Sequence, residues 1–204
     1  AVSRGAVVFI SAGNDADDDE HYSGTVSAGG STGFIQVNVA GAGADNTALY
    51  YNLAWYDGTG TSTDLELKYY DSSCSLVAST NGAQSESDRG TESEWSYKST
   101  YVSTGDSTWY LKVFNNSGSS QDFHLYYSTG YNQSNAGTVK FNSPDANYTV
   151  GSPADADDAI AVGAYNTRQT WYDYANDGWY YPNDPVGQIT TFSSRGPRID
   201  GAAK

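Results

Sequence analysis

The sequence is poor in cysteine and histidine, the two side chains that most often form crosslinks, nucleophiles or metal sites. Its single cysteine, Cys74, cannot form an internal disulfide. No nucleophile motif surrounds Cys74, and we expect it to lie in or near a core as a small apolar group. The only two histidines, His21 and His124, stand in no catalytic motif, so we expect them to be solvated or structural.

Positive charge and long apolar runs are also scarce. The chain has 10 Lys and Arg against 24 Asp and Glu, which gives a net charge of −14. Such a chain repels phosphate groups, so we expect no nucleic-acid partner. No run of about 18 apolar residues is present, so we expect no membrane span. With neither a leading methionine nor a signal peptide, both ends are expected to be cut from a longer polypeptide.

Aromatic residues are plentiful, at 14% with 18 tyrosines, whereas charged residues make up only 17%. Chains that remain disordered show the opposite balance. Residues 24–142 consist of short segments in which apolar and polar residues alternate between turn-forming residues, a pattern typical of a β-sandwich or jelly roll. One face of that sandwich is predicted to carry Ile35, Val37, Val39, Leu49, Tyr51, Leu53, Trp55, Leu65, Leu67, Tyr69, Trp109, Leu111, Val113, Phe123, Leu125 and Tyr127.

Two apolar segments outside this region follow a different pattern. Residues 6–10 are continuously apolar, as in a strand buried on both faces of a parallel sheet, and residues 159–164 predict a second apolar strand. The predicted fold is therefore mostly β. It comprises an antiparallel, jelly-roll-like β-sandwich flanked by pieces of an α/β parallel sheet.

Three sequence blocks occur in a fixed order. They are GAVVFISAGN at residues 5–14, TVGSP followed by AIAVGA between residues 149 and 164, and FSSRGP at residues 192–197. In this order they resemble the subtilisin-like serine peptidases, or subtilases. In that family the first two blocks lie close together, whereas more than a hundred residues separate them here. We therefore predict that residues 1–16 and 147–204 form part of a subtilase domain, interrupted by a β-sandwich at residues 17–146.

The resemblance implies roles for individual residues in peptide-bond hydrolysis through an acyl-enzyme. Asn14 would be the oxyanion-hole donor, Ser11, Ala12 and Gly13 would form a wall of the S1 pocket, and Gly151 would lie at its base. The Ser152–Pro153 bond would be cis. The alternatives are that Asn14 caps a strand-to-loop turn and that Gly151 is an ordinary turn glycine.

The resemblance also shows what the 204 residues lack. The family's aspartate and histidine motifs and its Gly-Thr-Ser nucleophile motif are not among them, so we expect this segment alone to be inactive. The parent is expected to be an extracellular endopeptidase that needs no cofactor for its chemistry. Its expected partners are a polypeptide substrate, the rest of the peptidase chain and a propeptide.

An acidic run follows Asn14, and Asp15, Asp17 and Asp19 are its candidate metal ligands. The run does not match the EF-hand pattern, because the required glycine and the final glutamate are absent. We interpret it as a solvated link, with a structural calcium site as the alternative.

A second class of function competes with catalysis. The β-sandwich could serve as a binding or accessory module for carbohydrate, protein or a surface. Residues 109–127 are similar to the final hairpin of the pre-peptidase C-terminal domains that accompany many secreted peptidases. The aromatic segment 165–181 is either a binding lip or a set of side chains packed under a long loop.

Overall fold

The fold is described from a computed structural model of the chain. The structure describes residues 5–42, 48–61, 63–80, 84–98, 105–128, 137–180 and 184–204. The chain divides into two compact units, one formed by Ala1–Asp18 with Ala146–Lys204 and the other by Asp19–Asp145.

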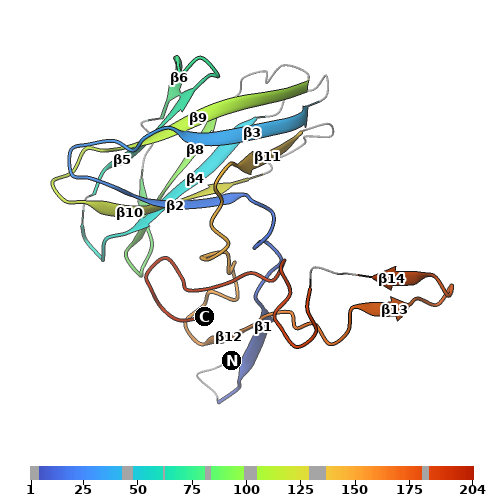
Figure 1. Ribbon diagram of the computed structural model, residues 1–204. Helices are drawn as coiled ribbons and strands as arrows, with labels where there is room; N and C mark the ends of the chain where they lie inside the picture. Colours follow the sequence, from blue (N-terminus) through green and yellow to red (C-terminus); the bar gives the residue numbers. More distant parts are fainter. Residues whose placement is uncertain are drawn as a thin grey trace. The chain divides into compact units, whose positions relative to one another are not determined.

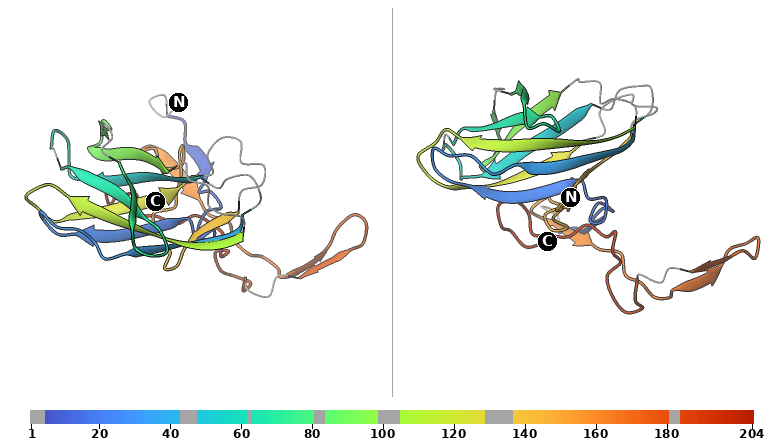
Figure 2. Two further views of the ribbon diagram at one scale, coloured as in Figure 1. Left: turned by 90° about the horizontal axis from the view of Figure 1, so that it is seen from above. Right: turned by 45° about the horizontal axis from the view of Figure 1, so that its top comes forward.

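The unit Asp19–Asp145 is a β-sandwich of two antiparallel five-stranded sheets (Figures 1 and 2). The first sheet has the order β2-β10-β4-β8-β7, with strands β2 (His21–Val26), β10 (Gln121–Tyr127), β4 (Leu49–Tyr56), β8 (Thr91–Lys98) and β7 (Ser85–Glu86). The second has the order β11-β3-β9-β5-β6, with strands β11 (Thr138–Phe141), β3 (Ile35–Ala42), β9 (Gly105–Asn115), β5 (Leu65–Tyr70) and β6 (Leu76–Ser79).

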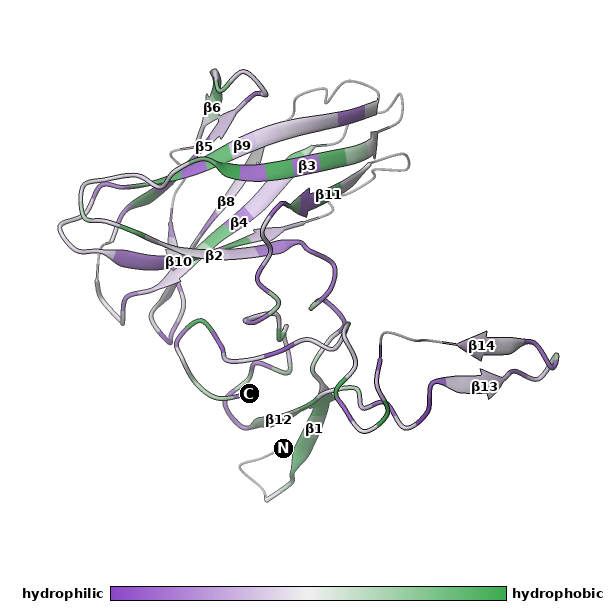
Figure 3. Cartoon of the chain, viewed as in Figure 1, coloured by the Kyte–Doolittle hydropathy of each residue, from purple (hydrophilic) through white to green (hydrophobic). Residues whose placement is uncertain are grey.

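The core of the sandwich lies between the two sheets and confirms the predicted alternation. Buried residues occur at every second position of the central strands, because successive side chains of a strand point to opposite faces. Polar residues alternate with apolar ones along β3, and this strand shows alternating purple and green bands in Figure 3. All the residues that the sequence predicts for the inner face of the sandwich belong to the core cluster except Trp109. Trp109 is partly buried and packs against the cluster.

Cys74 is exposed, so the expectation that it lies in or near a core is wrong. It occupies the turn between β5 and β6 with a φ of 60°. In this turn the Cys74 amide donates to the Asp71 carbonyl oxygen, and Asp71 Oδ1 accepts from the amides of Ser73 and Ser75. The local polar geometry of the turn therefore fixes the position of the thiol.

The two histidines are buried, so the expectation of solvated side chains is wrong and the structural alternative applies. His21 is 3% exposed and His124 is 6% exposed. His21 Nδ1 lies 2.8 Å from the carbonyl oxygen of Asp145, and His21 Nε2 lies 3.1 Å from Nδ1 of His124. The antiparallel pairing of β2 with β10 brings the two rings together and stacks the Tyr126 ring on His21 at 4.5 Å.

The second unit contains a two-stranded parallel sheet, in which β1 (Val8–Ser11) pairs with β12 (Ala159–Val162). Its residues are mainly hydrophobic, as Figure 3 shows in green, yet Phe9 is 66% exposed. The prediction of a strand buried on both faces is therefore wrong for this chain, because β1 has one neighbouring strand and no covering layer among the described residues. The described residues contain no helix, hence none that could span a membrane. The prediction of a mostly β fold is confirmed.

Residues 165–180 include a short hairpin in which β13 (Thr170–Tyr172) pairs with β14 (Gly178–Tyr180). Asp173 organises its turn by accepting hydrogen bonds from the Ala175 and Asp177 amides. Most of the aromatic side chains in this segment are exposed, so they do not pack under a loop; these are Tyr165, Tyr172, Tyr174, Trp179 and Tyr180. Tyr181, the last residue of the predicted aromatic segment, lies outside the described residues.

Candidate functional site

Asn14 lies just beyond the carboxyl end of β1, where the chain turns away from the parallel sheet. Ser11 ends the strand and is exposed, while the buried Ala12 continues the parallel pairing by donating from its amide to the Val162 carbonyl oxygen at 2.9 Å. The Asn14 side chain is exposed and has no hydrogen-bond partner among the described residues. Its carboxamide is therefore free to donate to a ligand.

Gly13 allows the turn that presents Asn14. Its φ is 108°, in the region that side chains other than glycine rarely adopt. A Cβ atom at this position would lie 2.7 Å from Ser194 Oγ and 2.9 Å from Asp15 Oδ2. The close approach of these two polar side chains therefore also requires glycine here.

Ser194 fixes the turn from the other side, although it lies far away in the sequence. It is buried, its amide donates to the Gly13 carbonyl oxygen at 3.0 Å, and its Oγ accepts from the Asp15 amide at 3.0 Å. The same hydroxyl donates to Asp15 Oδ2 at 3.1 Å. These bonds hold the backbone on both sides of Asn14, which suits a group that must be positioned before a ligand arrives.

The FSSRGP block also contacts the segment that carries Gly151. The Thr149 amide donates to the Arg195 carbonyl oxygen, and the Arg195 amide donates to Thr149 Oγ1, both at 2.9 Å. Residues 192–197 thus link the Asn14 turn to the Thr149 segment. Gly151 itself is exposed, with open space around its missing Cβ, and among the described residues no hydrogen bond joins it directly to residues 11–14.

The Ser152–Pro153 peptide bond is cis, as predicted, and Gly196–Pro197 is cis as well. The turn after Gly151 is closed by the Ala154 amide, which donates to the Gly151 carbonyl oxygen at 2.9 Å.

The acidic candidates for a metal site have separate partners. Asp15 Oδ2 accepts from Ser194 Oγ, and Asp17 Oδ2 accepts from Thr191 Oγ1 at 3.3 Å. Asp19 Oδ2 lies 3.1 Å from Lys140 Nζ. Within the described ranges, no group of three or more His, Cys, Asp or Glu side chains has an arrangement that could hold a metal ion.

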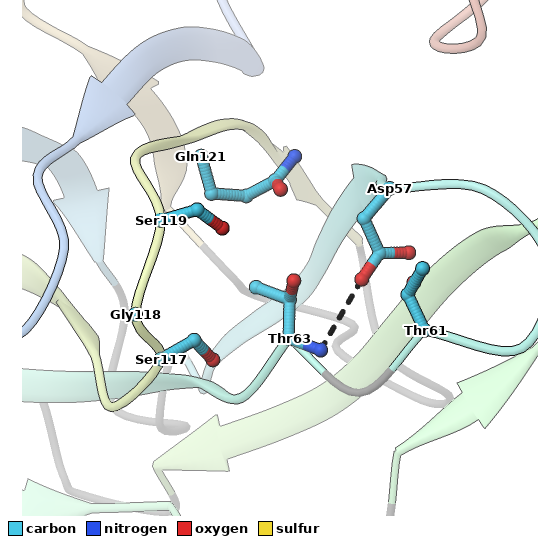
Figure 4. A pocket seen from close by; sticks show the side chains of 7 residues that line it. All are labelled: Asp57, Thr61, Thr63, Ser117, Gly118, Ser119 and Gln121. Carbon is cyan, nitrogen blue, oxygen red and sulfur yellow. Dashed lines mark hydrogen bonds between the residues drawn. The ribbon is translucent and has the colours of Figure 1, made fainter.

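A separate depression of about 510 Å³ lies in the sandwich, between the turn after β4 and the turn that joins β9 to β10 (Figure 4). Among the described residues that line it, Asp57 is the only charged side chain, and its Oδ2 accepts from the Thr63 amide at 3.2 Å. The described lining residues offer hydrogen-bonding groups but contain no acid–base or nucleophile–base pair; they are Asp57, Thr61, Thr63, Ser117, Gly118, Ser119 and Gln121.

Comparisons with known proteins address the family directly. The Subtilase family profile matches residues 1–204. The chain belongs to the subtilase family. Among solved structures, this subtilase chain is similar to the CspB protease of Clostridium perfringens, with 15% identity and a TM-score of 0.57 over 98% of the chain. That likeness shows a shared fold.

The chain spans 40% of the length of the clostridial protease. A second solved structure, the Yersinia pseudotuberculosis-derived mitogen, matches with 17% identity and a TM-score of 0.30, covering 61% of this chain and 95% of the mitogen. No curated protein matches the subtilase chain significantly.

The contribution of Ser194 to the site was not anticipated from the sequence. Its block carries the family resemblance, but Ser194 contacts Asp15, 179 residues away, and no local pattern indicates this pairing. The available signal in the sequence was the pair of serines within the FSSRGP block that carries the family resemblance.

Proposed function

We propose that the chain is part of a secreted serine endopeptidase of the subtilase family and that Asn14 donates a hydrogen bond to the oxyanion of the tetrahedral intermediate. The observation that carries the proposal is the Asn14 carboxamide itself. It is exposed at the end of β1 and has no hydrogen-bond partner among the described residues, while Gly13, Asp15 and Ser194 fix the backbone around it.

The chemistry follows from this arrangement. When a serine attacks a peptide carbonyl, negative charge develops on the carbonyl oxygen, and a donor already in place stabilises it without reorganisation. Ser11 is exposed at the end of β1, where we propose that residues 11–13 line the S1 pocket. Gly151 would lie at the base of that pocket.

The nucleophile and base are proposed to come from the remainder of the peptidase chain. The proposed partners are accordingly that remainder, a polypeptide substrate and a propeptide that assists maturation. We propose an extracellular location, which the acidic composition and low lysine content suit.

Replacing Asn14 in the intact peptidase tests the proposal. Asn14→Leu should lower kcat by about 10²–10³ while KM stays nearly unchanged, because the donor acts on the transition-state oxygen more than on the ground-state carbonyl. This magnitude is taken from an oxyanion-hole asparagine of the same family. Active-site titration should be combined with a thermal melt, so that kcat per folded molecule is measured.

The alternative role for Asn14, as a cap of the turn, gives the opposite result. It predicts a lower melting temperature or poor maturation with an unchanged titrated kcat, and that outcome would defeat the oxyanion assignment. The 204-residue chain serves as the blank: it should neither hydrolyse a chromogenic peptide nor react with a serine-directed fluorophosphonate.

A further inference from the structure

The outer face of the sheet β11-β3-β9-β5-β6 carries two lysines directly opposite each other. Lys68 on β5 and Lys112 on β9 are partners in the antiparallel ladder. Like charges at directly opposed positions destabilise a sheet, and they are two of five lysines in a chain of net charge −14. The two lysines are therefore unfavourable for the pairing of β5 with β9. They also form a positively charged site on a chain that is acidic as a whole.

Aromatic rings lie close to both ammonium groups, and one carboxylate lies beside Lys68. Lys68 Nζ lies 4.0 Å from the centroid of the Phe114 ring, and Lys112 Nζ lies 5.3 Å from Phe34 and 5.5 Å from Phe114. One carboxylate is close, with Glu66 Oε2 at 3.2 Å from Lys68 Nζ. Lys112 has no carboxylate partner in the part of the chain that the structure describes.

Two tyrosines extend the aromatic surface. Tyr70 pairs with Tyr110 across β5 and β9, and the Phe34 ring packs against both, with centroid distances of 5.1 and 5.5 Å. Phe34 is 47% exposed. We call this surface the lysine–aromatic patch: Phe34, Lys68, Tyr70, Tyr110, Lys112 and Phe114. Beside it on β3, Gln36 Nε2 donates to Asn38 Oδ1 at 2.9 Å, which adds side-chain amides to the same face.

We propose that the lysine–aromatic patch binds a carboxylated polysaccharide. The C–H faces of a sugar ring are apolar and can stack on half-exposed aromatic rings, while its hydroxyls can hydrogen-bond to amides. A sugar carboxylate would provide an anion for Lys112, which has none among the described residues, and would reduce its repulsion with Lys68.

The charge balance favours a glycan over a nucleic acid. Polynucleotide binding requires several cations along the phosphate backbone, whereas the patch has two lysines and the rest of the molecule is acidic. At physiological ionic strength the Debye length is about 8 Å, so exposed acids farther away are screened, and Lys68, Lys112 and Glu66 together leave a net positive charge at the patch. This inference is independent of the proposed peptidase function.

The test uses the 204-residue chain and polygalacturonate, which carries one carboxylate per sugar, in affinity electrophoresis and titration calorimetry at about 150 mM salt. Fully methyl-esterified polygalacturonate has the same backbone without charge, and a single-stranded oligo(dT) represents the nucleic-acid alternative. We expect binding to polygalacturonate and none to the ester or to oligo(dT).

Variants locate the site. Lys68→Gln and Lys112→Gln should each weaken binding about tenfold, since each removes a charge-assisted contact. Phe34→Ala should also weaken it, and Lys112→Arg should largely retain it. Lys140→Gln is the matched control: Lys140 is on the edge strand of the same sheet but outside the patch, and its replacement should leave affinity unchanged. A thermal melt of each variant excludes misfolding.

Four results would overturn the proposal. They are no binding to polygalacturonate, equal binding to its methyl ester, an equal loss in Lys140→Gln and Lys112→Gln, and binding to oligo(dT) at least as strong as to polygalacturonate. The last result would assign the patch to single-stranded nucleic acid.

Discussion

Two glycines assigned to the same candidate pocket differ sharply in their surroundings. Gly13 has a φ of 108° and two polar side chains close to where a Cβ would be, whereas Gly151 has open space there and no positive φ. The backbone around Asn14 therefore depends on one residue type, and the backbone at Gly151 does not.

This difference predicts the effect of an alanine at each position. Gly13→Ala should destabilise the Asn14 turn by about 1–3 kcal/mol, because alanine at this φ is strained and its Cβ would contact Ser194 Oγ. Amide hydrogen exchange at Asp15 and Ser194, whose N–H groups hold the turn, should then accelerate about tenfold to a hundredfold. Gly151→Ala is the control and should leave both rates unchanged. Equal protection in the two variants would show that the turn does not need glycine.

At the scale of strands, features set by residues close together in the sequence could be predicted. Features set by contacts between distant strands could not. The inward residues of β4 and β5 follow from a period of two within each strand, so they could be assigned without knowledge of any partner. The His21–His124 contact depends on the register of β2 against β10, and the strand patterns alone do not determine that register. The exposure of Phe9 likewise depends on what covers β1, which no property of the strand itself reveals.

The two histidines form a defined hydrogen-bonding pattern when both rings are neutral. A carbonyl oxygen can only accept, so His21 donates from Nδ1 to the Asp145 carbonyl oxygen; neutral His21 then accepts at Nε2 from the Nδ1–H of His124. Burial, reinforced by the neighbouring His21, lowers the pKa of His124 to about 4, although Asp145 and Asp122 act in the opposite direction. Folding therefore favours neutral His124.

The stability of the sandwich should consequently fall on acidification. The contribution of neutral His124 is complete above its ordinary pKa of about 6.5 and is lost progressively as pH falls toward 4, by up to about 3 kcal/mol. His124→Asn retains a donor near Nδ1 but cannot titrate in this range. The difference in unfolding free energy between wild type and His124→Asn, measured by urea titration, should shrink from pH 7 to pH 4.5. A difference that does not vary with pH would rule out the linkage to His124.

At the scale of the whole molecule, backbone hydrogen bonds join the first and last residues of the sandwich unit. The Phe141 amide donates to the Asp19 carbonyl oxygen at 2.8 Å, and the Asp145 amide donates to the His21 carbonyl oxygen at 2.9 Å. Every residue of the main hydrophobic cluster belongs to Asp19–Asp145. The unit thus contains both its core and the hydrogen bonds that join its ends.

A protein made of residues 19–145 alone should therefore fold cooperatively, with dispersed amide resonances and a single thermal transition. Leu111→Ala provides an internal check, since Leu111 is fully buried on β9 and its truncation should cost about 2–5 kcal/mol. That cost should be the same in the isolated unit and in the sandwich transition of the 204-residue chain, because all packing partners of Leu111 in the cluster are retained. A broad, non-cooperative melt of residues 19–145, or a much smaller effect of Leu111→Ala in the isolated unit, would mean that the sandwich needs the flanking subtilase segments to complete its core.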